Sequence, residues 1–271
     1  MKVNGNVGLQ QSMRRMLSGA QKMQAMQIRR IASGYRINSA GDDASGLAIG
    51  KRINAQITGL STASMNAQDA ISYIQTAEGA MDQVHSITNR MTELATRASN
   101  GLLSSTERNM IQAEYKQLSS EIDRIGQSTD FNGLKPFDGS SQQMQVGATA
   151  GEQITVEAGK LSAASLGLDK VDLSSLSGAQ SALDRISSAT DRVSSQRANL
   201  GATENSLAST INALDNTNEN LQAGLSRIMD ADIAKESTNR SISMALNATS
   251  IAMMKNAQQM MAYNAVSMLM R

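Results

Sequence analysis

Apolar side chains recur at helical spacing along most of the chain, in stretches separated by short polar or glycine-containing turns. The most regular stretch runs from Leu183 to Ile228 and alternates steps of three and four residues without a slip. A heptad sustained over such a length is typical of a coiled-coil seam. It predicts a helix of about 70 Å, in which the polar seam positions Arg197, Glu204 and Asn218 fix the register.

Residues 44–99 form the other long apolar stretch. Their stripe begins at Ile53 and passes Ile74, and beyond Met81 it moves to a new face. Such a shift indicates a change of packing partner or a break in the heptad. Because a long seam needs a partner of similar length, we expect this helix to pair antiparallel with the last long stretch.

Two helix starts carry capping signals. Asp42 or Asp43 can cap the helix over 44–99, since a short carboxylate accepts hydrogen bonds from the free N–H groups of a first turn. Ser104 and Glu107 have the spacing of a capping box. The stripe that follows predicts a third helix over 105–127.

Residues 134–177 differ from the rest of the chain. Two short β-prone runs, 144–147 and 154–156, flank a turn at 148–151, which predicts a β-hairpin. Ser, Gly and Ala are frequent around the hairpin, so we expect the connections there to be exposed and loosely packed.

The two ends of the chain share an unusual composition. Residues 1–34 and 229–271 hold 13 of the 18 methionines, and each end has a helical apolar stripe. Met is flexible and adapts to several neighbours, so we expect these faces to be buried on assembly. The stripe positions taken as assembly residues are Leu9, Met13, Met16, Met23, Leu246, Met253 and Met260.

The predicted fold is mainly α. A long antiparallel coiled-coil rod over 44–228 carries the small hairpin region, and the terminal segments 1–43 and 229–271 form a two-helix inner domain. Met and Ala faces bury little apolar surface, too little to offset the entropy of ordering. We therefore expect the terminal segments to be largely unordered in a dilute monomer.

Charge and composition argue against several classes of partner. The 25 basic and 24 acidic residues nearly cancel, so we expect no nucleic acid partner. The first helix is basic around its stripe, but that stripe lacks Trp and Phe and no apolar run is long enough to span a membrane. We therefore expect no membrane partner. The absence of Cys excludes disulfides and thiolate metal sites.

Candidate catalytic chemistry is sparse. The one histidine, His85, has no second histidine at helical spacing, so a packed or partly exposed helix residue is the favoured interpretation. The Asp42–Asp43 pair is better explained by helix capping than by acid–base catalysis. Phosphate-loop and nucleophile-elbow patterns are absent, and we expect no metal, no cofactor and no enzymatic activity.

Residues Ser33–Ile49 read SGYRINSAGDDASGLAI, and this run closely resembles the signature of bacterial flagellin. Further similar runs are Gly59-Leu60, Asn66-Ala67, Gln75–Ala80, Glu93–Ala95, Ile122–Ile125, Phe131–Gly133, Ala231–Ala234 and Met268–Arg271. The resemblance covers nearly the whole chain; the Met-rich stretch 260–264 and the opening residues 1–8 depart from the usual pattern.

This resemblance implies a secreted, extracellular subunit that assembles with copies of itself into the flagellar filament for motility. It implies export of the unfolded chain through the flagellar type III apparatus, with an export chaperone and a cap protein as partners. The terminal segments would line the filament's channel. Since the hairpin-bearing region 134–177 has only about 45 residues, the chain resembles a minimal flagellin without large outer domains.

The resemblance also implies recognition by Toll-like receptor 5. The family's receptor contacts fall on Arg90, Leu94 and Glu114, whereas Asn89 stands where strongly recognised members have Gln. Leu94 also lies in the apolar stripe, and the two charged residues can equally belong to a solvated face or to filament contacts.

Three other readings stay open at this point. A hook–filament junction protein shares the terminal pattern but would not polymerise into long filaments. A secreted adhesin or effector would need a binding domain larger than 134–177. A flagellin with a peptidase insert would need a His-Glu-x-x-His zinc motif, and this chain has one histidine.

Overall fold

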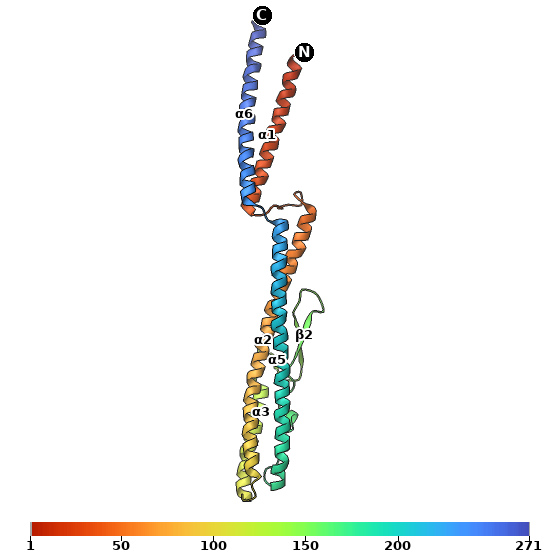
Figure 1. Ribbon diagram of the computed structural model, residues 1–271, viewed down its shortest axis with the longest axis vertical. Coiled ribbons are helices and arrows are strands. Elements are labelled where there is room, and N and C mark those ends of the chain that lie inside the picture. Colours follow the sequence, from red (N-terminus) through yellow and green to blue (C-terminus); the bar gives the residue numbers. More distant parts are fainter. Residues whose placement is uncertain (1, 271) are drawn as a thin grey trace. The chain divides into compact units, whose positions relative to one another are not determined.

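The computed structural model describes the backbone of residues 2–270, and it describes the side chains of residues 8, 11–260, 262, 263, 266 and 270. Within that part the chain is mainly helical, as predicted, with one two-stranded antiparallel sheet (Figure 1). The elements are α1 Lys2–Ser33, α2 Ala44–Ala98, α3 Ser105–Ser128, β1 Ser141–Gln145, β2 Gln153–Glu157, α4 Ala163–Leu166, α5 Leu176–Met229 and α6 Ile233–Leu269.

The chain divides into two compact units. The terminal unit comprises Met1–Ala55 and Asn220–Arg271, and the central unit comprises Gln56–Glu219. α2 begins at the predicted boundary 43/44, and α5 ends one residue beyond the predicted boundary 228/229. The division between the two units falls inside both helices.

In the central unit, α2 and α5 run antiparallel in a single register, as the heptads predict. Three side-chain contacts join the two helices, and successive contacts are separated by the same number of residues on both, first eleven and then seven. The contacts that define this register are Ser64 Oγ to Asp215 Oδ1 at 3.4 Å, Gln75 Nε2 to Glu204 Oε1 at 2.8 Å, and Arg197 Nη1 to Asp82 Oδ1 at 3.0 Å.

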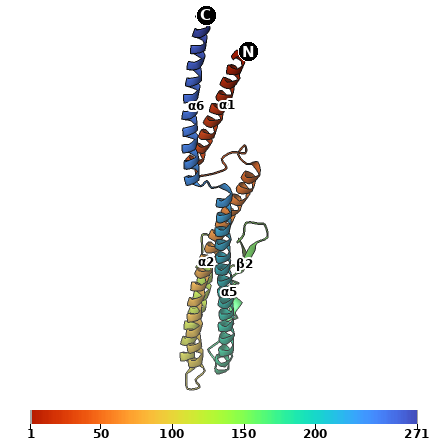
Figure 2. The same cartoon turned by 45° about the horizontal axis from the view of Figure 1, so that its top comes forward.

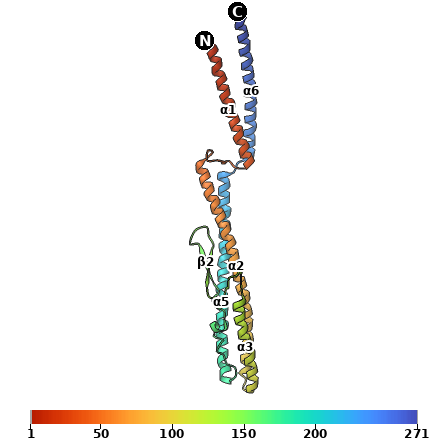
Figure 3. The same ribbon diagram turned by 180° about the vertical axis from the view of Figure 1, so that it is seen from behind.

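The core of the central unit is apolar and well packed. Ile74, Met81 and Met91 of α2 and Ile186 and Leu200 of α5 are almost completely buried. Small Ala residues between them allow close packing of the helices. The predicted face shift after Met81 is confirmed, because α3 lies beside this part of α2 (Figure 3).

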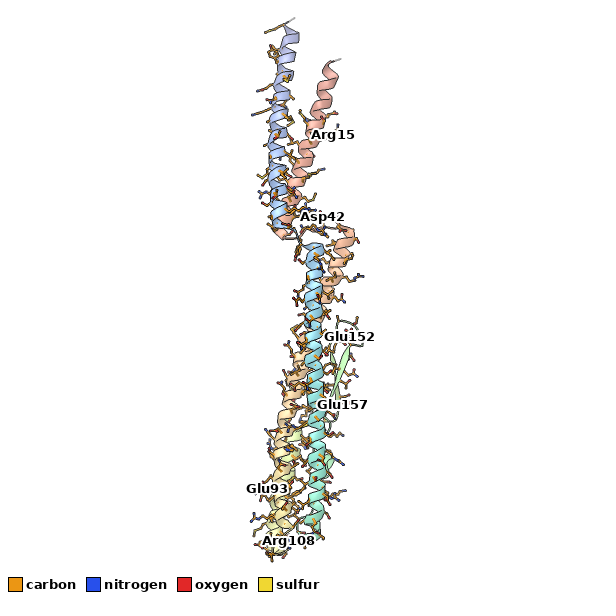
Figure 4. The ribbon with its side chains drawn as sticks, viewed as in Figure 1. Arg15, Asp42, Glu93, Arg108, Glu152 and Glu157 are labelled. Atoms are coloured by element: carbon orange, nitrogen blue, oxygen red, sulfur yellow. The ribbon has the colours of Figure 1, made fainter. Side chains whose placement is uncertain are left out.

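α3 begins with the predicted capping box. Ser104 Oγ accepts from the Glu107 backbone N–H, and the Glu107 carboxylate accepts from the Ser104 N–H and hydroxyl. The two hydrogen bonds that the Glu107 carboxylate accepts lower its pKa below the ordinary value, and the one from the Ser104 backbone N–H has the larger effect. Arg108 also donates to the Ala98 and Asn100 carbonyls at the end of α2 (Figure 4).

The hairpin is confirmed, with Ser141 paired to Glu157 and Gln145 to Gln153. The turn includes Gly151 at φ 98, a conformation that favours glycine. The Asn66 side chain of α2 donates to the Gln145 carbonyl at 3.1 Å and joins the hairpin to the helix pair.

The expectation of loosely packed connections around the hairpin is wrong. Residues from 156 to 173 contribute a row of buried apolar side chains to the core. The apolar residues fall at irregular spacing in this segment, so they show no helix or strand period, yet they pack against α3 and α5. They are Val156, Ala158, Leu161, Ala163, Leu166, Leu168, Val171 and Leu173.

In the terminal unit, α1 and α6 pack side by side, as the pattern of the two ends predicts (Figures 1 and 2). The segment that follows α1 and the segment that precedes α6 are hydrogen-bonded to each other. Arg36 N–H donates to the Met229 carbonyl at 2.6 Å, and Ala231 N–H donates to the Gly34 carbonyl at 2.8 Å. Gly34 takes φ 76, which permits the sharp turn after α1.

Candidate assembly surface

The turn that joins α1 to α2 is braced by Asp42 (Figure 4). Its carboxylate accepts from the Ser39 hydroxyl and from the backbone N–H groups of Asn38 and Ser39, at 2.9 to 3.1 Å. These hydrogen bonds lower the pKa of Asp42, and the bond from the Ser39 hydroxyl has the largest effect. Asp43 caps α2 through the Gly46 N–H at 2.8 Å, so of the two predicted cap residues Asp43 takes that role.

The contact between α1 and α6, called here the terminal seam, has heptad spacing on both helices. On α1 the less exposed residues recur in steps of four and three, and on α6 they recur in steps of seven, four and three. This spacing keeps one face of each helix turned toward the other. The positions are 13, 17, 20, 24, 27 and 31 on α1, and 236, 243, 247, 250, 254 and 257 on α6.

Much of the terminal seam is polar. Arg30 Nη1 and Glu236 Oε1 form an ion pair at 3.0 Å, and Asn247 Nδ2 donates to Gln24 Oε1 at 3.4 Å. Among the described residues, the buried atoms Gln27 Oε1, Arg30 Nε and Asn247 Oδ1 have no hydrogen-bond partner. Buried polar groups without partners cost free energy, so this contact holds the two helices together weakly.

Large apolar side chains are exposed on the outside of the pair. Met16 and Met23 on α1 and Leu246, Met253 and Met260 on α6 are between 54 and 68% exposed. They recur every seven residues, and Ile242, Met244, Ile251 and Tyr263 are exposed on α6 as well. We call the first five side chains the outer face.

Of the assembly residues predicted from the sequence, those that the structure describes lie on two different surfaces. Met16, Met23, Leu246, Met253 and Met260 lie on the outer face. Met13 is half-buried at the terminal seam, and the side chain of Leu9 lies outside the described residues. Apolar positions spaced by three and four span about a third of a helix, so one stripe supplies both surfaces.

A surface hollow of about 300 Å³ lies beside the turn between α1 and α2. Tyr35, Ile37, Leu47, Leu225 and Met229 give it a mainly apolar lining. All five side chains belong to the terminal unit, which therefore has a second apolar surface besides the outer face.

The predicted receptor residues fall in the central unit. Arg90 Nη2 and Glu114 Oε1 form an ion pair at 2.8 Å between α2 and α3, and Arg90 Nη1 also contacts Glu93 Oε2 at 2.7 Å. Hydrogen bonds from Glu114 first, and then Glu93, raise the pKa of Arg90. Arg90 and Glu114 are exposed, whereas Leu94 is 2% exposed and belongs to the core.

His85 is a partly buried residue of α2, and its backbone carbonyl accepts from the Thr88 hydroxyl at 2.8 Å. This agrees with its interpretation as a packed or partly exposed helix residue. The described residues contain no group of three His, Cys, Asp or Glu side chains arranged to hold a metal ion. Over the same part of the chain, no helix combines the length and apolar character needed to cross a membrane.

The polar character of the terminal seam was missed from the sequence. The stripe traced along α6 followed Ile242, Leu246, Met253 and Met260 because they are apolar. A parallel row through Glu236, Ser243, Asn247 and Ser250 keeps the same period with polar residues. A row of polar residues with the same helical period as a neighbouring apolar row therefore indicates a polar contact between two helices.

Comparison with known proteins gives one family. The model of the bacterial flagellin N-terminal helical region matches residues 3–142, and that of the C-terminal helical region matches residues 183–265. A flagellin of Halalkalibacterium halodurans is 44% identical over 236 residues, which cover 86% of this chain and 87% of the relative. Flagellin FlaB1 of Treponema pallidum is 36% identical over 248 residues, covering 85% and 87%.

Solved structures agree with the fold. The crystal structure of Bacillus cereus flagellin, at 28% identity and a TM-score of 0.51, covers 55% of this chain and 88% of its own. A putative flagellar hook-associated protein from Vibrio parahaemolyticus, at 14% identity and a TM-score of 0.59, shares the fold over 70% of this chain and 100% of its own.

Both terminal regions of the family are present, and the relatives of similar length align with most of the chain. Between α3 and α5 the chain holds only the hairpin and α4. The chain therefore belongs to the bacterial flagellins, as a form without large outer domains, and it is a structural subunit of the extracellular flagellar filament.

Proposed function

We propose that this flagellin polymerises through the outer face of its α1–α6 pair. The observation that carries the proposal is that polar side chains occupy part of the terminal seam, while the large apolar side chains of the outer face stay exposed. A pair that was stable alone would bury its apolar residues and expose its polar ones. Apolar side chains that recur along two helices mark a protein interaction site, and the partner is a second copy of this chain.

Charged substitutions on the outer face test this assignment. The variant Leu246→Lys/Met253→Lys places two charges on the outer face, and Met110→Lys is the matched control on an exposed methionine of α3. We expect the double variant to stay soluble when seeded with filament fragments and the control to form filaments, measured by sedimentation and electron microscopy. Filaments from the double variant at the normal yield would contradict the assignment.

Export and delivery to the filament end complete the proposed function. The chain has no cysteine, so no disulfide hinders passage of an unfolded chain through a type III apparatus. The exposed apolar residues of α6 need cover before assembly, which supports a flagellar export chaperone as a partner, with a cap protein at the growing end. Binding of the chaperone to the full chain, lost in the Leu246→Lys/Met253→Lys variant, is the expected result in calorimetry.

Binding of Toll-like receptor 5 is a second proposed function. Arg90 and Glu114 support it, because both are exposed and their ion pair holds them on one surface of α2 and α3. Leu94 is buried in the free subunit, so the proposal rests on Arg90 and Glu114. We propose no catalytic activity for this chain.

Receptor signalling in reporter cells tests this second function. We expect Arg90→Ala to reduce signalling and Arg124→Ala to leave it unchanged. Arg124 is the matched control, an exposed arginine of α3 that pairs with Glu121 one turn away. Equal signalling by the two variants would count against receptor contact at Arg90.

A further inference from the structure

The methionines of this chain differ widely in exposure. On α1 and α6, Met16, Met23, Met253 and Met260 are more than half exposed. In the central unit, Met81 and Met91 are completely buried. Oxidants reach a thioether in proportion to its exposure, so one chain contains both accessible and protected methionines.

The accessible methionines of α1 and α6 make up most of the outer face. Four of its five side chains are methionines, and the fifth is Leu246. Met is the one large apolar side chain that a mild two-electron oxidant converts into a polar group. A surface built mainly from Met is therefore apolar only while its sulfur atoms are reduced.

We propose that Met16, Met23, Met253 and Met260 are oxidation sites whose conversion to methionine sulfoxide blocks polymerisation, so that the free subunit is sensitive to peroxide and the assembled filament is protected. This inference rests on the proposed function, because it needs the outer face to be buried in the filament.

The chemistry needs only hydrogen peroxide as co-reactant. A lone pair of the thioether sulfur attacks one peroxide oxygen and forms an S–O bond while the O–O bond breaks. The departing hydroxide takes the proton of the transferred oxygen and becomes water, so the sulfur is oxidised by two electrons and the peroxide is reduced. The product is a polar, chiral sulfoxide.

A sulfoxide opposes assembly because its oxygen is a strong hydrogen-bond acceptor. In the free subunit, water satisfies that oxygen, whereas an apolar contact between subunits offers it no donor. Four such groups lie on each outer face. We therefore expect the critical concentration for polymerisation to rise about tenfold or more.

The test compares peroxide treatment of the free subunit with the same treatment of finished filaments, followed by site-resolved mass spectrometry and seeded assembly. In the free subunit we expect oxidation at Met16, Met23, Met253 and Met260 and none at Met81 or Met91. In filaments the first four are expected to be protected. Equal oxidation of these four methionines in subunit and filament would overturn the proposal.

Leu substitutions assign the effect to these sites, since Met and Leu have similar volumes. Whatever the yield of filaments from untreated Met16→Leu/Met23→Leu/Met253→Leu/Met260→Leu, we expect peroxide treatment to leave that yield unchanged. The control Met65→Leu/Met110→Leu removes two exposed methionines of the central unit, and we expect it to stay sensitive. Sensitivity of the fourfold variant, or resistance of the control, would overturn the proposal.

Two further results separate the possible failures. If the untreated natural chain does not polymerise, the proposed function fails before oxidation is tested. If the fourfold variant does not polymerise untreated, the protection pattern of the natural chain decides the question alone. Treatment of the oxidised subunit with methionine sulfoxide reductases and a thiol is expected to restore assembly, whereas lasting loss would point to other damage and contradict the proposal.

Discussion

Two helix pairs in this flagellin have the same heptad spacing but differ in the polarity of their seams. In the central unit, the seam of α2 and α5 is apolar and buried, and its polar contacts lie along its edge. In the terminal unit, the seam of α1 and α6 contains an ion pair and amides, and the four methionines of the outer face are exposed. The period alone fixes which residues share a face, and the chemistry of each face decides whether the pair is stable alone or in the filament.

Removal of a buried side chain is expected to show the largest difference between the two pairs. Ile186→Ala on α5 deletes a completely buried side chain and should lower the free energy of unfolding by about 2–5 kcal/mol. Ile242→Ala on α6 trims an exposed side chain of the same type and should change it by less than about 0.5 kcal/mol. Denaturant unfolding of both full-length variants checks the contrast, and equal losses would break it.

Replacing polar residues of the terminal seam with apolar ones should have the next largest effect on stability. Gln24→Leu with Asn247→Leu replaces a weak hydrogen bond with an apolar contact and should stabilise the α1–α6 pair of the monomer by about 1–3 kcal/mol. The matched control is Gln21→Leu, an exposed position on α1. Helix content of the dilute monomer, measured by circular dichroism, should rise in the double variant only; no rise would mean that the polar seam is not what weakens the pair.

Sequence alone predicted most of the central unit and less of the terminal one. Strong signals, such as the capping box at Ser104 and the unbroken heptad up to Ile228, placed the start of α3 and the end of α5 within a residue. The buried segment from 158 to 173 had no period to reveal it, because its Leu and Val residues pack from a loop and a short helix. The polar part of the terminal seam was missed because only the apolar stripe of each terminal helix was traced.

Loss of the α3 cap should have a smaller effect, confined to the central unit. Ser104→Ala removes the side-chain oxygen that accepts from the Glu107 N–H, and the expected loss of unfolding free energy is about 1 kcal/mol. Ser237→Ala on α6, an exposed helix position, is the control. A loss at Ser237 equal to that at Ser104 would show that the cap itself contributes nothing.

Acid should produce the smallest change. The pKa of Glu107 is lower in the folded chain than its ordinary value of 4.5. Its contribution to stability is therefore complete above that value and is lost as pH falls through the folded pKa. Denaturant midpoints measured from about pH 6 down to about pH 3 should fall less steeply for Glu107→Gln than for the natural chain. Parallel curves would show that the capping carboxylate is not responsible.

Amide hydrogen exchange of the dilute monomer and of the filament tests the central claim most directly. In the monomer we expect slow exchange along α2 and α5 within the central unit and fast exchange along α1 and α6, because the terminal seam is weak. In the filament we expect α1 and α6 to become protected as the outer face is buried. Strong protection of α1 and α6 already in the monomer, unchanged on assembly, would contradict the account.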